Sequence, residues 1–387
     1  MPQRSSFVAT STVGLTPAER TKAHLDGRSP PRSDSRRAFW HEALAPYARP
    51  NRTGSALCLA TSVVPYLVLS ALMYAALGVS YGLTLVLAIP AAGFLIRTFI
   101  VFHDCTHGSF LPSKRANRWL GTTLGLLVFA DFRSWKHNHA IHHASAGDLG
   151  RRGGGDVPTL TVAEYLARSG RGRLAYRLFR HPLLMFGLGP IFALVVQPRI
   201  VPSKARSRIK HSVIATNVAL VVLVGALCWL LGWRAYLLIE LPTIMLAGAA
   251  GIWLFYVQHQ FEDAYWESGE TWTYADAALR GSSYLKLPKV LQFFSGNIGL
   301  HHVHHLSPRI PNYNLQRAHD ENPIFHEVPV ITLSDGLRAV KLKLYDERQE
   351  RMVTFAQADA GDQPATRRLP SRVFGRPRGY RSTINQP

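Results

Sequence analysis

The sequence is poor in cysteine and in acidic residues. Its 387 residues include only 3 cysteines, Cys58, Cys105 and Cys228, and no two of them stand at the spacing of a metal-binding or redox pair. A disulfide framework is therefore not expected. Lys and Arg number 44 against 24 Asp and Glu, which gives a formal net charge of +20. This imbalance favours a negatively charged partner, either a nucleic acid or the surface of an anionic membrane.

The sequence also lacks the motifs that would support a nucleic-acid partner. Its basic residues form no recognition helix, zinc finger or RNA-binding signature. They gather in the segments that flank long apolar runs, which is typical of a membrane protein. We therefore expect membrane lipid, and no nucleic acid, as the anionic partner.

Neither end of the sequence has a long apolar stretch. Residues 1–38 are rich in Ser, Arg, Pro and Thr, so we expect a disordered segment and no secretory signal peptide. Residues 355–387 carry six Arg and two Asp together with Pro and Gly. We predict a basic disordered tail there, close to anionic lipid headgroups. The folded domain is expected to span residues 39–354.

Four apolar runs dominate the remainder, at 55–79, 82–102, 213–232 and 235–257. A bilayer core about 30 Å thick needs about 20 helical residues, so each run is long enough to span a membrane. The connectors inside each pair are very short, which predicts two tight helical hairpins. The fold class is therefore an all-α integral membrane protein, with four transmembrane helices and a helical cap. Two shorter runs, 119–129 and 183–197, are expected to be interfacial or re-entrant.

The positive charge predicts the orientation of the hairpins. Two hairpins place residues 1–54, 103–212 and 258–387 on one side of the membrane. Residues 1–54 carry nine Lys and Arg and residues 103–182 carry twelve, whereas the two hairpin tips carry one Arg in total. The shared side is therefore expected to be the cytoplasmic side of the inner membrane, with both termini there.

Histidine is present 17 times, and the stretch 136–144, KHNHAIHHA, holds four of these residues. Packing does not explain them, because histidine is only an average helix former with little apolar surface. The chain has one HxxxH pattern, two HxxHH patterns and a single histidine after the fourth apolar run. Residues i, i+3 and i+4 share one face of a helix, so each pattern aims its imidazoles in one direction. The nine candidate metal ligands are His103, His107, His139, His142, His143, His259, His301, His304 and His305.

The positions of these histidines indicate one shared site. His103 directly follows the second apolar run and His259 follows the fourth, so all nine can converge under the membrane surface. Nine ligands exceed the four that zinc takes, whereas two octahedral irons could use nine or ten. Imidazole suits iron, zinc and copper alike, so ligand type alone does not choose the metal. A pair of irons at the mouth of a membrane bundle points to O₂ chemistry on a lipid chain.

Each piece of the pattern has an ordinary alternative. A lone HxxxH arises often by chance on a surface helix, and His259 alone would more often be a hydrogen-bonded histidine. His137 and His302 fall outside the shared helical faces and are weaker candidates. The three patterns together, each beside an apolar hairpin, indicate a metal site.

HxxxH, HxxHH and HxxHH around two membrane hairpins resemble the integral-membrane fatty acid desaturase superfamily, over roughly residues 40–345. The strings YVQHQFEDAYWE and GNIGLHHVHHLSPRIPNYNLQRAHDENP are similar to the bacterial acyl-lipid desaturases of the Δ12 type. The resemblance implies four membrane helices capped by a cytoplasmic domain. It also implies that O₂ is used to remove two vicinal hydrogens from an acyl chain, with two electrons from an external donor.

We call the HxxxH pattern and the two HxxHH patterns the three histidine boxes. The resemblance further assigns their eight histidines as ligands of two iron ions. His259 matches an extra histidine that follows the fourth helix in relatives. Some relatives add an Asn four residues before it, where this chain has Phe255. That leaves the tenth ligand open, with water as a substitute. The sequence HPLL at His181 does not match the haem-binding His-Pro-Gly-Gly motif, so a fused cytochrome b5 domain is not expected. Electrons are expected from a separate ferredoxin, flavoprotein or cytochrome.

Charged residues near the boxes are candidates for supporting roles. Acidic side chains can orient a ligand imidazole through its second ring nitrogen. The acidic candidates are Asp104, Asp148, Asp156, Glu262 and Asp263. Basic residues could hold an acidic headgroup or a donor protein, or simply supply inside-positive charge. These are Arg133, Lys136, Arg151 and Arg152.

Two rival functions remain open at the level of sequence. A hydroxylase of lipids, alkanes or carotenoids would use the same irons but insert oxygen instead of removing a second hydrogen. A histidine-rich metal transporter would need ionisable ligands inside the spans, whereas these histidines stand at the ends of the spans.

Overall fold

The computed structural model describes residues 40–153 and 155–360 of the chain. It divides into two units, Met1–Ala43 and Leu44–Pro387. The predicted disordered segment 1–38 lies outside the described residues. The predicted tail begins with a short helix, Phe355–Ala360, and its remainder also lies outside them.

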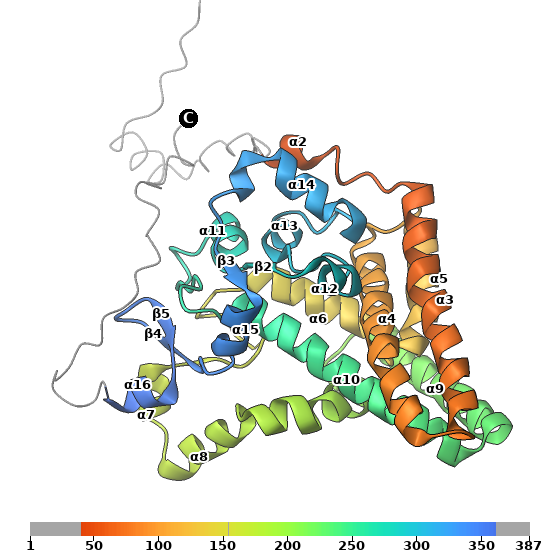
Figure 1. Cartoon of the computed structure of the whole chain (residues 1–387). Helices are drawn as coiled ribbons and strands as arrows, with labels where there is room; N and C mark the ends of the chain where they lie inside the picture. The colour runs from red at the N-terminus through yellow and green to blue at the C-terminus, as the bar shows by residue number, and fades with distance from the viewer. Residues whose placement is uncertain (1–39, 154, 361–387) are drawn as a thin grey trace, which may run out of the picture. The chain divides into compact units, whose positions relative to one another are not determined.

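Figure 1 shows the order of the helices and strands along the chain. The helices of the first half are α2 (Trp40–Leu44), α3 (Arg52–Leu77), α4 (Tyr81–His107), α5 (Lys114–Leu127), α6 (Phe132–Ser145), α7 (Val162–Leu166), α8 (Gly170–Phe179), η1 (Leu184–Leu188), η2 (Ile191–Val196) and η3 (Gln197–Arg199). Those of the second half are α9 (Ser207–Leu231), α10 (Trp233–His259), α11 (Tyr274–Leu279), α12 (Lys289–Phe294), α13 (His301–Leu306), η4 (Asn312–Asn314), α14 (Leu315–Glu321), η5 (Pro323–Phe325), α15 (Leu333–Ala339) and α16 (Phe355–Ala360). The strands are β1 (Leu160–Thr161), β2 (Tyr284–Lys286), β3 (Val330–Thr332), β4 (Leu344–Asp346) and β5 (Arg351–Val353).

Four helices, α3, α4, α9 and α10, are by length and composition able to cross a membrane, and they coincide with the four predicted apolar runs. They contain 25 to 27 residues each, more than the roughly 20 that a bilayer core needs. Helix α4 continues past its apolar run to His107, where Gly108 ends it with a φ of +71°. Helix α10 likewise continues to His259. Both helices therefore carry polar residues beyond the apolar part of the span.

Spanning helices that are adjacent in the sequence contact each other, and α10 also packs against α4. Helices α3 and α4 run side by side (Figure 1), and the Thr84 hydroxyl on α4 donates to the Met73 carbonyl on α3 over 3.3 Å. Helices α9 and α10 contact each other and are separated by Gly232 alone, at a φ of +85°. That each pair crosses a bilayer as a hairpin stays a prediction.

The two shorter apolar runs form helices outside these four. Run 119–129 lies mostly in α5, where Trp119 is exposed. Run 183–197 forms η1 and η2, which continue from α8 after a bend of 51°. By length and composition, this bent pair is either a broken span or a re-entrant loop.

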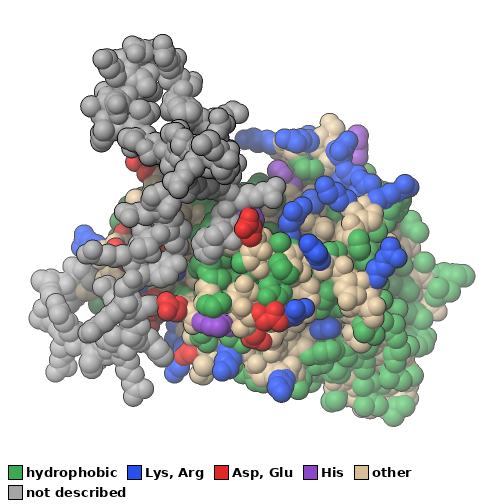
Figure 2. Space-filling model, turned by 90° about the horizontal axis from the view of Figure 1, so that it is seen from above, with side chains coloured by type: hydrophobic (Ala, Val, Ile, Leu, Met, Phe, Trp, Pro, Cys, Tyr) green, Lys and Arg blue, Asp and Glu red, His purple; other side chains and the backbone are tan. Residues whose placement is uncertain are grey.

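Figure 2 shows hydrophobic side chains on the side where Figure 1 places α3, α4 and α9, and Lys and Arg over the neighbouring face.

The described part of the chain is mostly helical, as predicted, but it also contains two small sheets. Strand β4 lies between β1, which is parallel to it, and β5, which is antiparallel. Strands β2 and β3 form a separate parallel pair. Strands of two or three residues leave no alternating pattern in a sequence, which explains why they were not predicted.

Two buried basic residues lie beside the three-stranded sheet. Arg180, in the bend between α8 and η1, has no exposed surface, and Lys343, just before β4, is 4% exposed. The Lys343 ammonium lies 3.9 Å from the Met185 sulfur and 5.2 Å from the centre of the Tyr256 ring. Among the described residues neither cation forms an ion pair with an acid. Burial, together with the Arg180 charge, lowers the pKa of Lys343 from 10.5 to about 7.

This shift predicts how stability depends on pH. Between about pH 7 and pH 10 the unfolded chain holds a proton on Lys343 that the folded chain has lost, so the contribution of this group to stability rises with pH. We expect Lys343→Met to melt at a higher temperature than wild type near pH 7, and the difference to shrink as the pH rises. Melting of detergent-solubilised protein across this range measures the effect. The exposed Lys341→Met is the control, and a Lys343→Met difference that is the same at every pH would contradict the assignment.

Candidate metal centre

The first histidine pair stands at the end of α4. His103 and His107 are one helical turn apart, and their ring centres lie 4.8 Å from each other. The αL conformation of Gly108 ends α4 directly after His107 and turns the chain away. Both imidazoles therefore lie at the end of a spanning helix, as the sequence predicted.

The second box lies on α6, which is fixed to α9. The Asp131 carboxylate caps α6 by accepting from the Ser134 N–H over 2.7 Å. Its other oxygen accepts from the Ser212 and Thr216 hydroxyls of α9, over 2.6 and 2.9 Å. The same Asp131 side chain caps α6 and binds α9. The direction of α6 is therefore set relative to the spanning helix α9.

The third box lies on α13 and is held against α4. The turn before α13 contains Gly296 and Asn297, with φ of +54° and +60°. A Cβ atom on Gly296 would lie 2.9 Å from a methyl group of Ile100, so a side chain at Gly296 would separate the turn from α4. Glycine at this position therefore allows box three to approach the end of α4.

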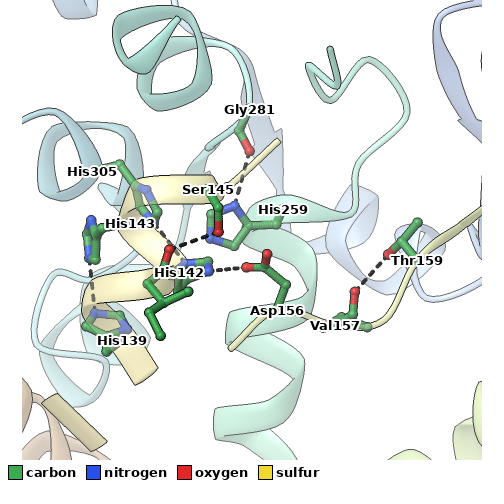
Figure 3. A network of polar contacts seen from close by, with 12 residues as sticks. His139, His142, His143, Ser145, Asp156, Val157, Thr159, His259, Gly281 and His305 are labelled. Atoms are coloured by element: carbon green, nitrogen blue, oxygen red, sulfur yellow. Dashed lines mark hydrogen bonds and ion pairs between the residues drawn. The ribbon is translucent and has the colours of Figure 1, made fainter. Parts of the chain in front are cut away.

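These elements bring all nine predicted histidines together in two clusters, within each of which the possible ligand nitrogens lie within 4.8 Å of one another. The first cluster contains His103, His107, His139, His143 and His304. The second contains His142, His259, His301 and His305. Each HxxHH box serves both clusters, because its i and i+4 histidines enter one cluster and its i+3 histidine enters the other. Figure 3 shows part of this arrangement around α6.

The distances between ring nitrogens fit a metal better than hydrogen bonds. In the first cluster the His139 Nε2 lies 3.0 Å from the Nε2 atoms of both His103 and His143. The His143 Nε2 also lies 3.0 Å from that of His304. An imidazole nitrogen has either one proton or one lone pair, so such a chain cannot give each contact its own donor and acceptor. Lone pairs that converge on a cation satisfy every nitrogen at once.

The second cluster repeats this geometry. The His305 Nε2 lies 3.2 Å from that of His142 and 3.1 Å from that of His301. The His301 Nε2 is in turn 2.9 Å from that of His259. Two neighbouring groups of inward-facing imidazole nitrogens are therefore present, each suited to one metal ion.

Burial favours the neutral form of five of these imidazoles. Burial, with nearby histidines adding to its effect, lowers the pKa well below 6.5 for His139, His143, His301, His304 and His305. A metal binds the lone pair of a neutral imidazole, so this environment favours the form that acts as a ligand.

Only some imidazoles have a partner on the second ring nitrogen. Asp104 accepts from the His103 Nδ1 over 3.2 Å and also from the Asn312 backbone N–H over 2.7 Å. Asp156 accepts from the His142 Nδ1 (Figure 3). The Gly281 carbonyl oxygen lies 3.2 Å from the Nδ1 atom of His259. Each of these bonds fixes the tautomer that turns the Nε2 lone pair inward.

The other charged candidates lie elsewhere. Asp148 accepts from Arg151 over 2.5 Å, Glu262 pairs with Arg351 over 3.1 Å, and Asp263 is exposed. Arg152 pairs with Glu164, and the Lys136 ammonium donates to the Thr106 carbonyl. Two of the five acidic candidates, Asp104 and Asp156, therefore contact cluster imidazoles.

The two weaker histidine candidates lie outside both clusters. His137 is exposed on α6. His302 is fully buried, and its Nε2 lies 3.0 Å from the Nδ1 of His319, a contact that no sequence pattern indicates. Burial lowers the pKa of His302 to about 3. Phe255 lies beside the second cluster, 5.1 Å from the His142 ring centre, and offers no ligand atom.

Comparison with known proteins shows the family to which the chain belongs. The sequence model of the family described as Fatty acid desaturase matches residues 78–330, well over half of the chain. A fatty acid desaturase of Bacillus subtilis is 46% identical over 312 residues, which are 81% of this chain and 89% of the relative.

Two more distant relatives come from Synechocystis. An sn-1 oleoyl-lipid 12-desaturase is 27% identical over 243 residues, 58% of this chain and 64% of the relative. An sn-1 acyl-lipid omega-3 desaturase (ferredoxin) is 26% identical over 233 residues, 57% of this chain and 62% of the relative. The chain thus spans less than two thirds of the length of these two proteins. The resemblance seen in the histidine patterns is confirmed, and the chain belongs to the fatty acid desaturase family, whose members are membrane-bound oxidoreductases that act on fatty acyl chains.

Proposed function

We propose that this desaturase acts on the acyl chains of membrane lipids and holds two iron ions, one in each histidine cluster. The observation that carries the proposal is the place of the clusters. His103 and His107 occupy the last turns of α4, and His259 ends α10. The clusters therefore lie next to the ends of two apolar spans, where the acyl chains of the bilayer would be close to them.

The number and type of ligands favour iron over zinc. The first cluster has five imidazoles, one more than a structural zinc site takes, and the second has four. Among the described residues no cysteine joins either cluster. Imidazole supports iron in oxidation chemistry, and bound iron would supply the activation of O₂ that an unreactive acyl chain needs. Phe255 leaves the four-histidine cluster one ligand short of the five-histidine cluster, which leaves room there for water.

The protein's own residues would prepare the site for this chemistry. All four imidazoles of the second cluster are buried, which limits their contact with bulk water. Asp104 and Asp156 orient one imidazole in each cluster. A prearranged set of ligands lowers the cost of organising the site when substrate and electrons arrive.

The electron donor is proposed to be a separate protein. One cyanobacterial relative is named as a ferredoxin-dependent type, which supports a ferredoxin, with a flavoprotein or cytochrome as alternatives. The excess of Lys and Arg in residues 1–54 and 103–182 supports the cytoplasmic side of the inner membrane as the place where the clusters and the donor meet.

Product analysis tests the proposed reaction. A bacterial host that expresses this chain should accumulate lipid acyl chains with one more double bond, because the clusters lie at the ends of two spans. Mass spectrometry of the extracted lipids measures this product. Hydroxylated chains in place of unsaturated ones would instead support the rival hydroxylase function, and a host with an empty vector is the control.

Metal analysis tests the proposed cofactor. We expect about two irons per chain, since each cluster offers one set of converging nitrogens. Zinc can replace iron during overexpression, so the protein should be stripped with a chelator and reloaded with either metal. Full activity with zinc alone, or activity that does not depend on iron, would rule the proposal out.

The role of His259 can be tested separately, because it is the one ligand candidate outside the three boxes. We expect His259→Ala to abolish desaturation and to lower bound metal to about one ion per chain, because the second cluster then keeps three imidazoles. The exposed His137→Ala is the matched control and should keep both metals and activity. His302→Ala should lower stability, since it leaves a cavity beside His319, but should keep both metals. Wild-type metal content in His259→Ala would remove His259 from the ligand set.

A further inference from the structure

Arg180 is a fully buried cation whose role is not explained by the histidine boxes. It lies in the bend between α8 and η1 and has no exposed surface. Burying a charge without an opposite charge is costly, and such a residue is kept only where many acceptors surround it. No acid among the described residues pairs with Arg180, and all of its hydrogen-bond partners are neutral oxygens.

The two arms of the guanidinium reach different elements. Nη1 donates to the Pro158 carbonyl over 2.6 Å and to the Tyr176 hydroxyl over 3.0 Å, and lies 3.5 Å from the Thr159 hydroxyl. Nη2 donates to the Gln260 side-chain oxygen and to the Tyr256 hydroxyl, both over 3.0 Å. Arg180 therefore joins the segment 158–159 to the end of α10.

The first of these segments lies two residues after Asp156, the carboxylate that accepts from His142. Gly155 precedes Asp156 with a φ of +86°, and a Cβ atom there would lie 2.8 Å from the Asn138 carbonyl of α6. The chain thus lies close to α6 at Gly155, and this brings the Asp156 carboxylate next to His142 (Figure 3). Two residues later, the Pro158 carbonyl is held by Arg180, which limits how far Asp156 can move from His142.

The second segment carries His259. Gln260 follows His259 directly, and its side-chain oxygen accepts from both Arg180 and the Thr159 hydroxyl, the latter over 3.2 Å. Gln260 is itself only 1% exposed. One guanidinium therefore holds the segments that position two of the four imidazoles of the second cluster, those of His142 and His259. None of the Arg180 contacts reaches a histidine of the first cluster.

We propose that Arg180 is a positioning residue for the four-histidine cluster, acting through Asp156 on His142 and through Gln260 on His259. The inference rests on the proposed function, because it requires a metal ion in that cluster. The planar fork of arginine is what holds both segments at once. Lysine at the same place keeps a positive charge but offers a single ammonium, so it cannot bridge the same pair of segments.

Metal release separates this role from general stability. We expect Arg180→Lys to release one of its two metals to a chelator about tenfold faster than wild type, while the other metal stays as tightly bound as before. The matched control is Arg177→Lys, one turn earlier on α8, where Arg177 pairs with Asp359 over 2.7 Å at the surface. The control should release both metals at the wild-type rates. Faster release of both metals together would indicate a general loss of structure and overturn the inference.

A second variant keeps the test valid if Arg180→Lys does not fold. Gln260→Met has a similar volume and leaves Arg180 in place, but it removes the acceptor next to His259. We expect the same selective release of one metal from Gln260→Met. Unchanged release from folded Gln260→Met would overturn the arm of the inference that acts through His259.

A double-mutant cycle tests the arm that acts through Asp156. If Arg180 acts by holding Asp156, adding Arg180→Lys to Asp156→Asn should speed release less than it does in wild type. Effects that multiply independently would overturn this arm. Wild-type protein that binds fewer than two metals would overturn the proposed function and the inference with it. Two metals in wild type and unchanged release from Arg180→Lys would overturn the inference alone.

Discussion

The structure depends on the requirement that nine buried imidazole nitrogens turn their lone pairs toward two points. Nitrogens about 3 Å apart cannot all be satisfied by hydrogen bonds to one another, because each has only one proton or one lone pair. Interleaving the two HxxHH boxes solves the geometric part of the problem. Since each box contributes to both clusters, α6 and α13 must keep their relative position for either cluster to form. Loss of one helix contact would therefore disturb both clusters.

The support around the two clusters is uneven. Asp104 belongs to the same helix as the histidine it orients, and it also accepts from the Asn312 backbone, so it ties α4 to the segment after α13. Asp156 reaches the second cluster from a glycine-containing segment that has no regular structure of its own. Its place depends on contacts made farther along the chain, at Pro158 and Thr159. The carboxylate that supports the four-histidine cluster is thus held by a segment outside the helices, whereas Asp104 is part of helix α4.

The parts of this structure that the sequence predicts are those encoded by local spacing. Apolar runs of helical length indicate the four spans, and i, i+3, i+4 spacing indicates eight of the nine histidines. The place of His259 directly after the fourth run indicates the ninth. The sequence does not show that Asp104 and Asp156 contact histidines whereas Asp148 contacts an arginine. All three stand near a histidine box, and position in the sequence does not tell which way a carboxylate points. Arg180 was missed for a related reason: its partners lie 4 to 80 residues away, and a buried arginine looks like inside-positive charge in a sequence. The small sheets left no periodic signal at all.

The lengths of α4 and α10 connect the membrane part to the chemistry. Both helices continue without a break from an apolar span into residues that face the clusters, so the last turns of each are rigid extensions of the bundle. A ligand on a loop could adjust to the metal, whereas His103, His107 and His259 are set by how the spans pack. Helix α6 is tied to α9 through Asp131, and the turn before α13 packs on Ile100 of α4. The positions of both clusters are therefore fixed relative to the spanning helices.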